Sequence, residues 1–184
     1  MKGKGFTLVE LLVVLAIIGI VTGFGIPQVA SALQNSKKSS YLNEFVGLIL
    51  FTRNSAIASG HVTLLCPSSD EKTCEADWSQ PLMAFSDLNG NKELDEDESI
   101  LRKLPANENF RVSFRAFGGT KALRYYPSGM TYRQNGTFTI CPVSHDNSLI
   151  SAVIINRGGR PKLATDSDGD GLVDLPSGNR PGCT

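Results

Sequence analysis

The N-terminal segment of the chain constrains its fold more than any other feature. Residues 6–26 form an almost unbroken apolar run, FTLVELLVVLAIIGIVTGFGI, which follows two lysines, Lys2 and Lys4. A helix needs about 20 apolar residues to cross the hydrocarbon core of a bilayer, so this run is long enough to span one. Glu10 interrupts the run near its start, where a carboxylate is costly and usually functional. The sequence therefore predicts a membrane-spanning helix with a specific task for one acid.

Two simple explanations account for only part of this segment. A secretory signal peptide fits poorly, because the apolar run is too long and no small-x-small cleavage site follows it before Pro27. A plain membrane anchor, with the lysines held on the cytoplasmic side, explains the lysines and the length. It leaves Glu10 without a purpose.

A family resemblance explains the whole segment. Residues 2–12, KGKGFTLVELL, closely resemble the prepilin signature of the type IV pilin and type II secretion pseudopilin superfamily. In that superfamily a dedicated peptidase cuts between Gly and Phe and methylates the new N-terminal amine, and the fifth mature residue is Glu. The resemblance implies that Gly5 and Phe6 form the processing site and that Glu10 is an assembly residue. A carboxylate in lipid must be neutralised or paired, and the free amine of a neighbouring Phe6 is a suitable partner that would set axial register.

Pro27 extends the resemblance, because the superfamily also has a proline 22 residues after the cut. An interior proline kinks or locally melts a helix, and the resemblance implies a role for Pro27 in assembly. Beyond it, residues 28–59 read as an amphipathic continuation of the helix, ended by Gly60. One face of this continuation is formed by Leu42, Phe45, Ile49, Thr52 and Ala56.

After Gly60 the pattern changes to short segments rich in β-branched and aromatic residues, separated by turn formers. The predicted strands are His61–Cys66, Leu82–Ser86, Ile100–Leu104, Arg111–Phe117, Ala122–Tyr126, Thr137–Cys141 and Ala152–Asn156. No second helix alternates with them, so we expect an α+β fold: a long N-terminal helix packed on a small antiparallel β domain. The apolar half of the helix would span the membrane. The expected segments are a leader (1–5), a hydrophobic membrane and filament-core helix (6–30), its amphipathic second half (31–60) and an exported β-rich domain (61–184).

Four cysteines lie beyond the predicted anchor, on the side where disulfides form and persist. Three connectivities are possible. We favour Cys66–Cys74, which closes a short loop, and Cys141–Cys183, which ties down the C-terminal tail and resembles the disulfide-bounded loop of pilins. A zinc site is disfavoured because the spacing contains no CxxC or Cys-His pattern.

Two acidic loops resemble calcium ligand ladders. In the first, residues 87–98, side-chain oxygens recur at EF-hand positions, but Lys92 stands where the ladder needs glycine, so we expect a solvated turn. The second, residues 166–174, has the required Gly171 and resembles the DxDxDGxxD loops of dockerin and thrombospondin type repeats. Its expected ligands are Asp166, Asp168, Asp170, Asp174 and the carbonyl of Leu172. Ser177 replaces the bidentate acid, so the loop is either a weak Ca²⁺ site or a disordered acidic tail.

A basic element follows the last predicted strand. Residues 156–162, NRGGRPK, carry Arg157, Arg160 and Lys162 around a Gly-Gly turn, and such cations can contact phosphates without reading sequence. The alternative is an ordinary turn with exposed basic residues. Together with FSDLNGNKELDEDESILR and NGTFTIC, this segment resembles the GspH/FimT/FimU class of minor pilins. Some FimT-like members bind DNA through a Gly-Arg-x-Arg element, but here the final Arg is Lys162, which lacks the bidentate fork.

Charge and motifs narrow the remaining function classes. The 18 basic and 18 acidic residues balance, so the whole chain exerts no electrostatic pull on nucleic acid. His61 and His145 lack a recognisable nucleophile partner, which predicts a non-enzyme that requires no cofactor, with Ca²⁺ as a possible ligand. The resemblance implies a minor pilin that primes or caps a type IV pilus. A type II secretion pseudopilin and a DNA-binding minor pilin for natural transformation remain as alternatives.

The same resemblance implies the partners and the location of the chain. The partners would be other major and minor pilins, the prepilin peptidase, the inner membrane before assembly and, in the third alternative, DNA. The chain would cross the inner membrane once with its N-terminus in the cytoplasm and its domain in the periplasm, and would then enter a pilus or pseudopilus.

Overall fold

The computed structural model describes residues 5–117 and 119–183 of the chain. It contains two compact units, Met1–Ser40 and Tyr41–Thr184, and each is described by itself. One run of helical residues from Leu8 to Ser59 contributes to both units and is long and apolar enough, by length and composition, to cross a membrane.

The first unit is helical. Helix α1 (Leu8–Ile20) is followed by a π-helical turn, η1 (Val21–Gly25), and by helix α2 (Ile26–Ser59). The turn ends two residues before Pro27, which has no N–H to donate to the carbonyl of Gly23. The irregularity that the sequence predicts at Pro27 therefore takes the form of a π-helical turn just N-terminal to it; the side chain of Pro27 lies outside the described residues.

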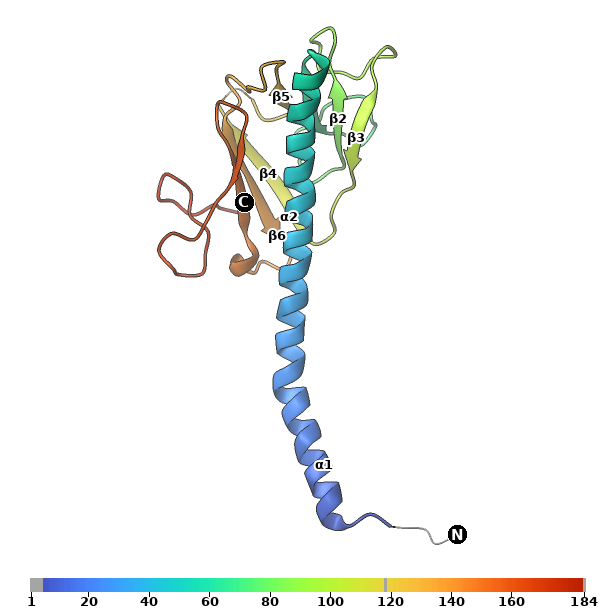
Figure 1. Cartoon of the computed structure of the whole chain (residues 1–184), viewed down its shortest axis with the longest axis vertical. Coiled ribbons are helices and arrows are strands. Elements are labelled where there is room, and N and C mark those ends of the chain that lie inside the picture. The colour runs from blue at the N-terminus through green and yellow to red at the C-terminus, as the bar shows by residue number, and fades with distance from the viewer. Residues whose placement is uncertain (1–4, 118, 184) are drawn as a thin grey trace. The chain divides into compact units, whose positions relative to one another are not determined.

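The second unit contains two antiparallel sheets (Figure 1). The first has the strand order β3-β2-β1-β5, and the second has the order β4-β6-β7-β8. The strands of the first sheet are β1 (Thr63–Pro67), β2 (Leu82–Ser86), β3 (Ile100–Leu104) and β5 (Leu123–Tyr125). Those of the second are β4 (Phe110–Ala116), β6 (Gly136–Pro142), β7 (Ser151–Ile155) and β8 (Pro161–Leu163), with a 3₁₀ turn, η2 (Asn147–Leu149), before β7. The α+β fold predicted from the sequence is confirmed.

The C-terminal half of α2 forms part of the core of this unit. Its buried side chains join those of both sheets in one cluster; the helix contributes Tyr41, Phe45, Leu48, Ile49 and Ala56. The ring of Phe45 meets that of Phe138 on β6 edge-to-face, with centroids 5.1 Å apart, and Trp78 meets the same ring at 4.7 Å. The face predicted from helical spacing is thus the buried one. Gly60 ends the helix with φ +72°, a left-handed conformation that glycine adopts without a steric cost.

Two disulfides fix the loops of the second unit. Cys66 is bonded to Cys74 across a separation of 8 residues, and Cys141 is bonded to Cys183 across a separation of 42 residues. These are the pairs that the sequence favoured.

Candidate functional site

The start of the helix is built by a cap that the sequence analysis did not single out. Thr7 is extended, and its Oγ1 accepts a hydrogen bond from the N–H of Glu10 at 3.3 Å. Thr7 followed three residues later by Glu10 is the spacing of a capping box, so the signal was present in the sequence. Glu10 lies in the first helical turn, where the partial positive charge of the helix N-terminus stabilises a carboxylate.

The processing residues lie ahead of this cap. Gly5 and Phe6 precede the helix without secondary structure, and Phe6 is 86% exposed. Residues 1–4 of the expected leader lie outside the described residues. Gly5, Phe6 and Glu10 therefore fall within one short, exposed stretch at the beginning of the helix.

Helix α1 exposes its apolar side chains. None of its residues is buried, and each of its leucine, valine and isoleucine side chains is about half exposed or more. Removal of apolar surface from water is favourable by roughly 25 cal/mol per Å². The helix thus has the surface expected of a segment covered by lipid or by other helices.

The second acidic loop brings together part of its predicted ligand set. Carboxylate oxygens of Asp166, Asp168 and Asp174 all lie within 4.8 Å of one another. Hydrogen bonds from the N–H groups of Gly171 and Gly169 lower the pKa of Asp166, so its carboxylate is ionised at neutral pH. Three clustered carboxylates are ligands of the kind that Ca²⁺ prefers.

The other two predicted ligands of that loop are Asp170 and the carbonyl of Leu172, and Asp170 already has partners within the chain. The carboxylate of Asp170 forms an ion pair with Arg180, and its Oδ1 accepts the N–H of Leu172 at 2.8 Å. Asp170 is therefore engaged by a cation of the chain itself. A calcium ion that used all four aspartates would have to displace Arg180.

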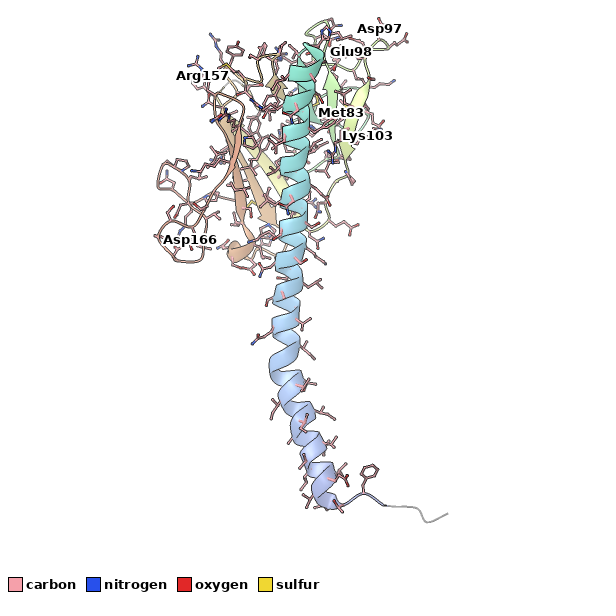
Figure 2. All side chains as sticks on the ribbon, viewed as in Figure 1. Met83, Asp97, Glu98, Lys103, Arg157 and Asp166 are labelled. Carbon is pink, nitrogen blue, oxygen red and sulfur yellow. A yellow bond between two sulfur atoms is a disulfide. The ribbon has the colours of Figure 1, made fainter. Side chains whose placement is uncertain are left out.

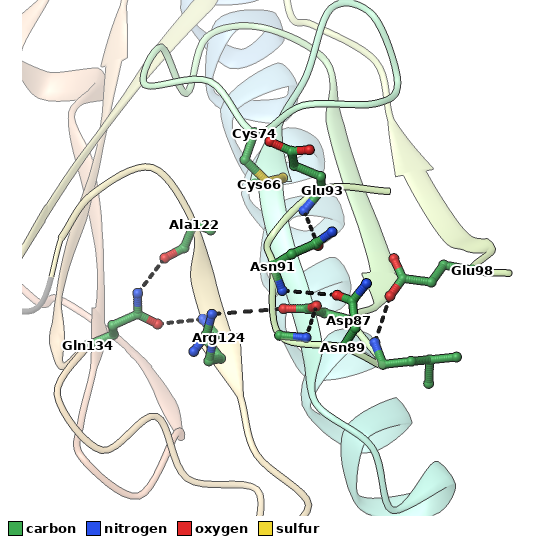
Figure 3. A network of polar contacts seen from close by, with 12 residues as sticks. Cys66, Cys74, Asp87, Asn89, Asn91, Glu93, Glu98, Ala122, Arg124 and Gln134 are labelled. Atoms are coloured by element: carbon green, nitrogen blue, oxygen red, sulfur yellow. Dashed lines mark hydrogen bonds and ion pairs between the residues drawn. A yellow bond between two sulfur atoms is a disulfide. The ribbon is translucent and has the colours of Figure 1, made fainter. Parts of the chain in front are cut away.

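The first acidic loop differs from the solvated turn that the sequence predicted. Asp87 is only 2% exposed, and its Oδ1 accepts the N–H of Gly90 at 2.8 Å. Glu98 closes the loop by accepting the N–H of Leu88 at 2.7 Å (Figure 3). Lys92, at the position where the ladder needs glycine, adopts the left-handed conformation with φ +69°. The expectation of a solvated turn is thus wrong at Asp87, because the loop folds back on itself and buries this carboxylate.

The basic element forms a tight hairpin between β7 and β8. The side-chain oxygen of Asn156 accepts the N–H of Arg160 at 3.0 Å, and the backbone carbonyl of Asn156 accepts that of Gly159 at 2.9 Å. Arg157, Arg160 and Lys162 are all exposed. Figure 2 shows Arg157 and Asp166 on separate projections of this unit. The three cations predicted to meet DNA are therefore presented on one hairpin, and Arg157 lies apart from Asp166.

Comparisons with known proteins identify the class of the chain. The family model described as type II transport protein GspH matches residues 42–159, and the prokaryotic N-terminal methylation motif matches residues 1–26. No curated protein matches the chain by sequence at a significant level.

Solved structures share the fold. The type IV minor pilin FimU of Pseudomonas aeruginosa aligns with a TM-score of 0.56 and 16% identity, over 71% of this chain and 90% of that chain. The minor pseudopilin EpsH of the type II secretion system of Vibrio cholerae aligns with a TM-score of 0.51 and 14% identity, over 71% of this chain and 98% of that chain. Both alignments show a common fold.

Proposed function

The chain belongs to the GspH family of minor pilins and pseudopilins, and from this premise we propose that it is a minor pilin of a type IV pilus. In this role it is a structural subunit, without enzymatic activity, that primes or caps the filament. The observation that supports a filament subunit of either kind is the helix start, where Gly5 and Phe6 lie exposed ahead of a capped helix that places Glu10 in its first turn.

The geometry of the helix start suits processing followed by assembly. An exposed Gly5–Phe6 bond outside the helix is accessible to the prepilin peptidase at the membrane surface, and cleavage there leaves the amine of Phe6 as the new N-terminus. Glu10 then lies four residues after that N-terminus. In a filament, the carboxylate of one subunit pairs with the amine of the next, because an unpaired carboxylate in an apolar bundle is costly.

Membrane insertion precedes this pairing. The exposed apolar helix crosses the inner membrane once, with Lys2 and Lys4 on the cytoplasmic side and the disulfide-bonded domain in the periplasm. Transfer into the filament then replaces lipid with the apolar helices of other pilins. One helix therefore serves as a membrane anchor first and as part of the filament core afterwards.

Substitution of Glu10 tests this mechanism. We expect Glu10→Ala to remain in the membrane fraction, because the apolar run is unchanged, but to be at least ~10-fold depleted from sheared filaments in immunoblots. Glu44→Ala removes an exposed carboxylate from the same helical run and serves as the control. Normal incorporation of Glu10→Ala would overturn the role that we assign to this residue.

A pseudopilin of a type II secretion system is the main alternative, since it has the same fold and the same N-terminal processing. Deletion of the gene, scored separately for twitching motility, secretion and transformation, distinguishes the two. Loss of twitching with normal secretion supports the pilus subunit. Loss of secretion alone supports the pseudopilin.

The basic hairpin supports a DNA-binding minor pilin for natural transformation as a third candidate. Arg157, Arg160 and Lys162 are exposed on one short hairpin, which permits simultaneous contact with neighbouring phosphates. A mobility shift assay at several salt concentrations, with Arg157→Gln and Arg160→Gln together, tests this candidate. Unchanged binding of DNA by the double variant removes it.

A further inference from the structure

Two adjoining hollows open beside strand β5. Their volumes are about 340 Å³ and 480 Å³, and their walls share Lys92, Arg124 and Gln134. Lys121 lines the smaller hollow, and Arg133 lines the larger one. We call the two together the basic hollow, because they gather four cations from three separate stretches of the chain. Glu93 in the smaller hollow is the acid in these walls.

The backbone of Arg124 is held in place between the two parts of the basic hollow. Its backbone N–H donates to the side-chain oxygen of Gln134 at 2.6 Å, and the amide nitrogen of Gln134 donates to the carbonyl of Ala122 at 2.7 Å (Figure 3). The guanidinium Nη2 lies 3.8 Å from Oδ2 of the buried Asp87, beyond hydrogen-bonding distance. The side chain of Arg124 is 22% exposed and lines both hollows, and its distance from Asp87 leaves its charge only partly neutralised.

The other cations of the basic hollow supply its excess positive charge. Among the described residues, Lys92, Lys121 and Arg133 take part in none of the ion pairs, which involve Lys103, Arg124 and Arg180. The walls thus hold four cations against one acid, Glu93, with the buried Asp87 beside Arg124 as a second. A cluster of like charges of this kind favours an anionic ligand.

We propose that the basic hollow binds the phosphodiester backbone of a single-stranded nucleic acid. In the larger hollow the free polar side chains are cationic N–H donors and tyrosine hydroxyls, while the amide of Gln134 and the hydroxyl of Thr131 are used within the fold. A phosphodiester strand presents only acceptors along its backbone, which such donors satisfy. An acidic peptide also presents N–H groups, and these need acceptors, of which the larger hollow has no carboxylate to offer.

Two tyrosines supply the second element of single-strand recognition. Tyr126 and Tyr132 both line the larger hollow, and their rings meet edge-to-face with centroids 4.7 Å apart. Tyr132 is 44% exposed, and its backbone adopts φ +48°, a conformation that is costly outside glycine and that holds the ring at the surface. An exposed ring beside a row of cations is the arrangement on which unpaired bases stack.

The basic hollow is joined to the basic hairpin. Thr131, which lines the larger hollow, donates its N–H to the carbonyl of Arg157 at 3.3 Å and its hydroxyl to the carbonyl of Asn156 at 3.3 Å. A strand seated in the hollow can therefore continue toward Arg157 and Arg160. The proposed DNA-binding surface thus extends from the basic hairpin to the cations and aromatic rings of the basic hollow. The choice of a nucleic acid as the ligand rests on the DNA-binding function proposed above.

The test measures how salt changes the affinity for a fluorescein-labelled 15-nucleotide oligothymidine, followed by anisotropy with the full-length protein in nonionic detergent. For single strands, the slope of log Kobs against log salt is about −0.7 per neutralised phosphate. Lys92→Gln with Arg133→Gln should make the slope shallower by about 1.4 and weaken binding. Arg102→Gln with Lys103→Gln removes the same charge from β3, at the opposite edge of the first sheet from β5, and should leave the slope unchanged.

The hairpin double variant separates this inference from the function on which it rests. The hairpin variant is Arg157→Gln with Arg160→Gln, and the hollow variant is Lys92→Gln with Arg133→Gln. If the salt slope changes in the hairpin variant but not in the hollow variant, the basic hollow is overturned and the hairpin candidate is kept. If the salt slope changes in the hollow variant alone, the basic hollow is kept as a binding site and the hairpin is rejected as one. Absence of oligonucleotide binding by the parent protein would overturn both.

Two further arms test the chemistry of the ligand. Tyr132→Leu should weaken binding of oligothymidine ~5-fold or more but leave binding of an abasic strand of equal length unchanged, since only the former can stack. Polyglutamate of equal charge should compete less well than unlabelled oligothymidine. Equal or better competition by polyglutamate would show that an acidic protein segment, and not a nucleic acid, is the partner.

Discussion

Gly159 lies where any side chain would collide with its surroundings. A Cβ atom at this position would stand 2.2 Å from the carbonyl oxygen of Gly129 and 2.7 Å from Cε1 of Tyr125, and the backbone has φ +74°. The hydroxyl of Tyr125 in turn donates to the carbonyl of Gly159 at 3.0 Å. Gly159 thus allows the basic hairpin to pack closely against β5, the strand that carries Arg124.

Substitution of this glycine should loosen the hairpin. We expect Gly159→Ala to lower the free energy of unfolding by about 2 kcal/mol or more, because the left-handed backbone and the close carbonyl are both incompatible with Cβ. Gly158→Ala is the matched control, since its Cβ would meet only Oδ1 of Asn156 at 3.4 Å. Urea denaturation of the full-length protein in nonionic detergent measures both. Equal stability of the two variants would contradict the packing described here.

The spacing of acidic residues in the loop 87–98 did not predict the backbone conformation of Lys92. The sequence places a lysine where a ligand ladder needs glycine, and this predicted a simple solvated turn. In the structure the loop keeps its fold because Lys92 accepts a left-handed conformation, and Asp87 is buried at its start. The buried carboxylate lies 3.8 Å from the guanidinium of Arg124, which is 37 positions later in the sequence and is invisible to any local pattern.

The acidic loop at residues 166–174 is an element whose ligands are partly preassembled. Pairing of Thr165 with Asp174 in an isolated β-bridge closes the loop around its three clustered carboxylates. The ion pair between Asp170 and Arg180 competes with any bound cation for one of the four aspartates. We therefore propose a weak Ca²⁺ site at this loop.

Calcium should stabilise the protein through this loop. At ten times its Kd, a ligand that binds only the folded state raises the free energy of unfolding by about 1.4 kcal/mol. We expect isothermal titration to show Ca²⁺ binding by the parent and its loss in Asp168→Ala. Asp97→Ala, an exposed carboxylate in the other acidic loop, is the control. No heat of Ca²⁺ binding in the parent would end the proposal.

The elements with a periodic pattern were predictable, and those built by distant contacts were not. Each of the seven predicted strands is present, with ends shifted by two residues at most, because alternation and turn residues are local signals. Strand β8, only three residues long and beginning with a proline, carries no such signal. The basic hollow also escaped prediction, since Lys92, Arg124 and Arg133 are brought together by the pairing of strands and by loops without periodicity.

At the scale of the whole molecule, the long helical run belongs partly to each of the two units. Its first part, through Ser40, belongs to the unit whose apolar side chains are exposed, whereas residues from Tyr41 onward belong to the disulfide-bonded unit. The amphipathic half predicted for residues 31–60 therefore becomes a core element only from Tyr41. A family model that begins at residue 42 starts at nearly the same point.

This division predicts how the chain responds to truncation. A fragment of residues 41–184 should unfold cooperatively in thermal circular dichroism, because it keeps every buried side chain of α2. A fragment of residues 60–184 loses Phe45, Leu48 and Ile49, each at most 1% exposed, together with the other helical core residues. At about 1.5–3 kcal/mol for each large apolar side chain, the loss approaches or exceeds the 5–15 kcal/mol that stabilises a typical domain.

The shorter fragment also loses the hydrogen bond from Nε of Arg53 to the carbonyl of Gly129, 3.1 Å long, which ties the helix to the loop beside the basic hairpin. We therefore expect residues 60–184 to lack a cooperative transition and to bind a hydrophobic dye, even with both disulfides intact. A fragment of residues 31–184 is the control, since residues 31–40 add no buried side chain to residues 41–184, and it should melt at the same temperature. A cooperative transition of residues 60–184 at that temperature would show that the helix is an appendage, and that the β sheets form a complete core without it.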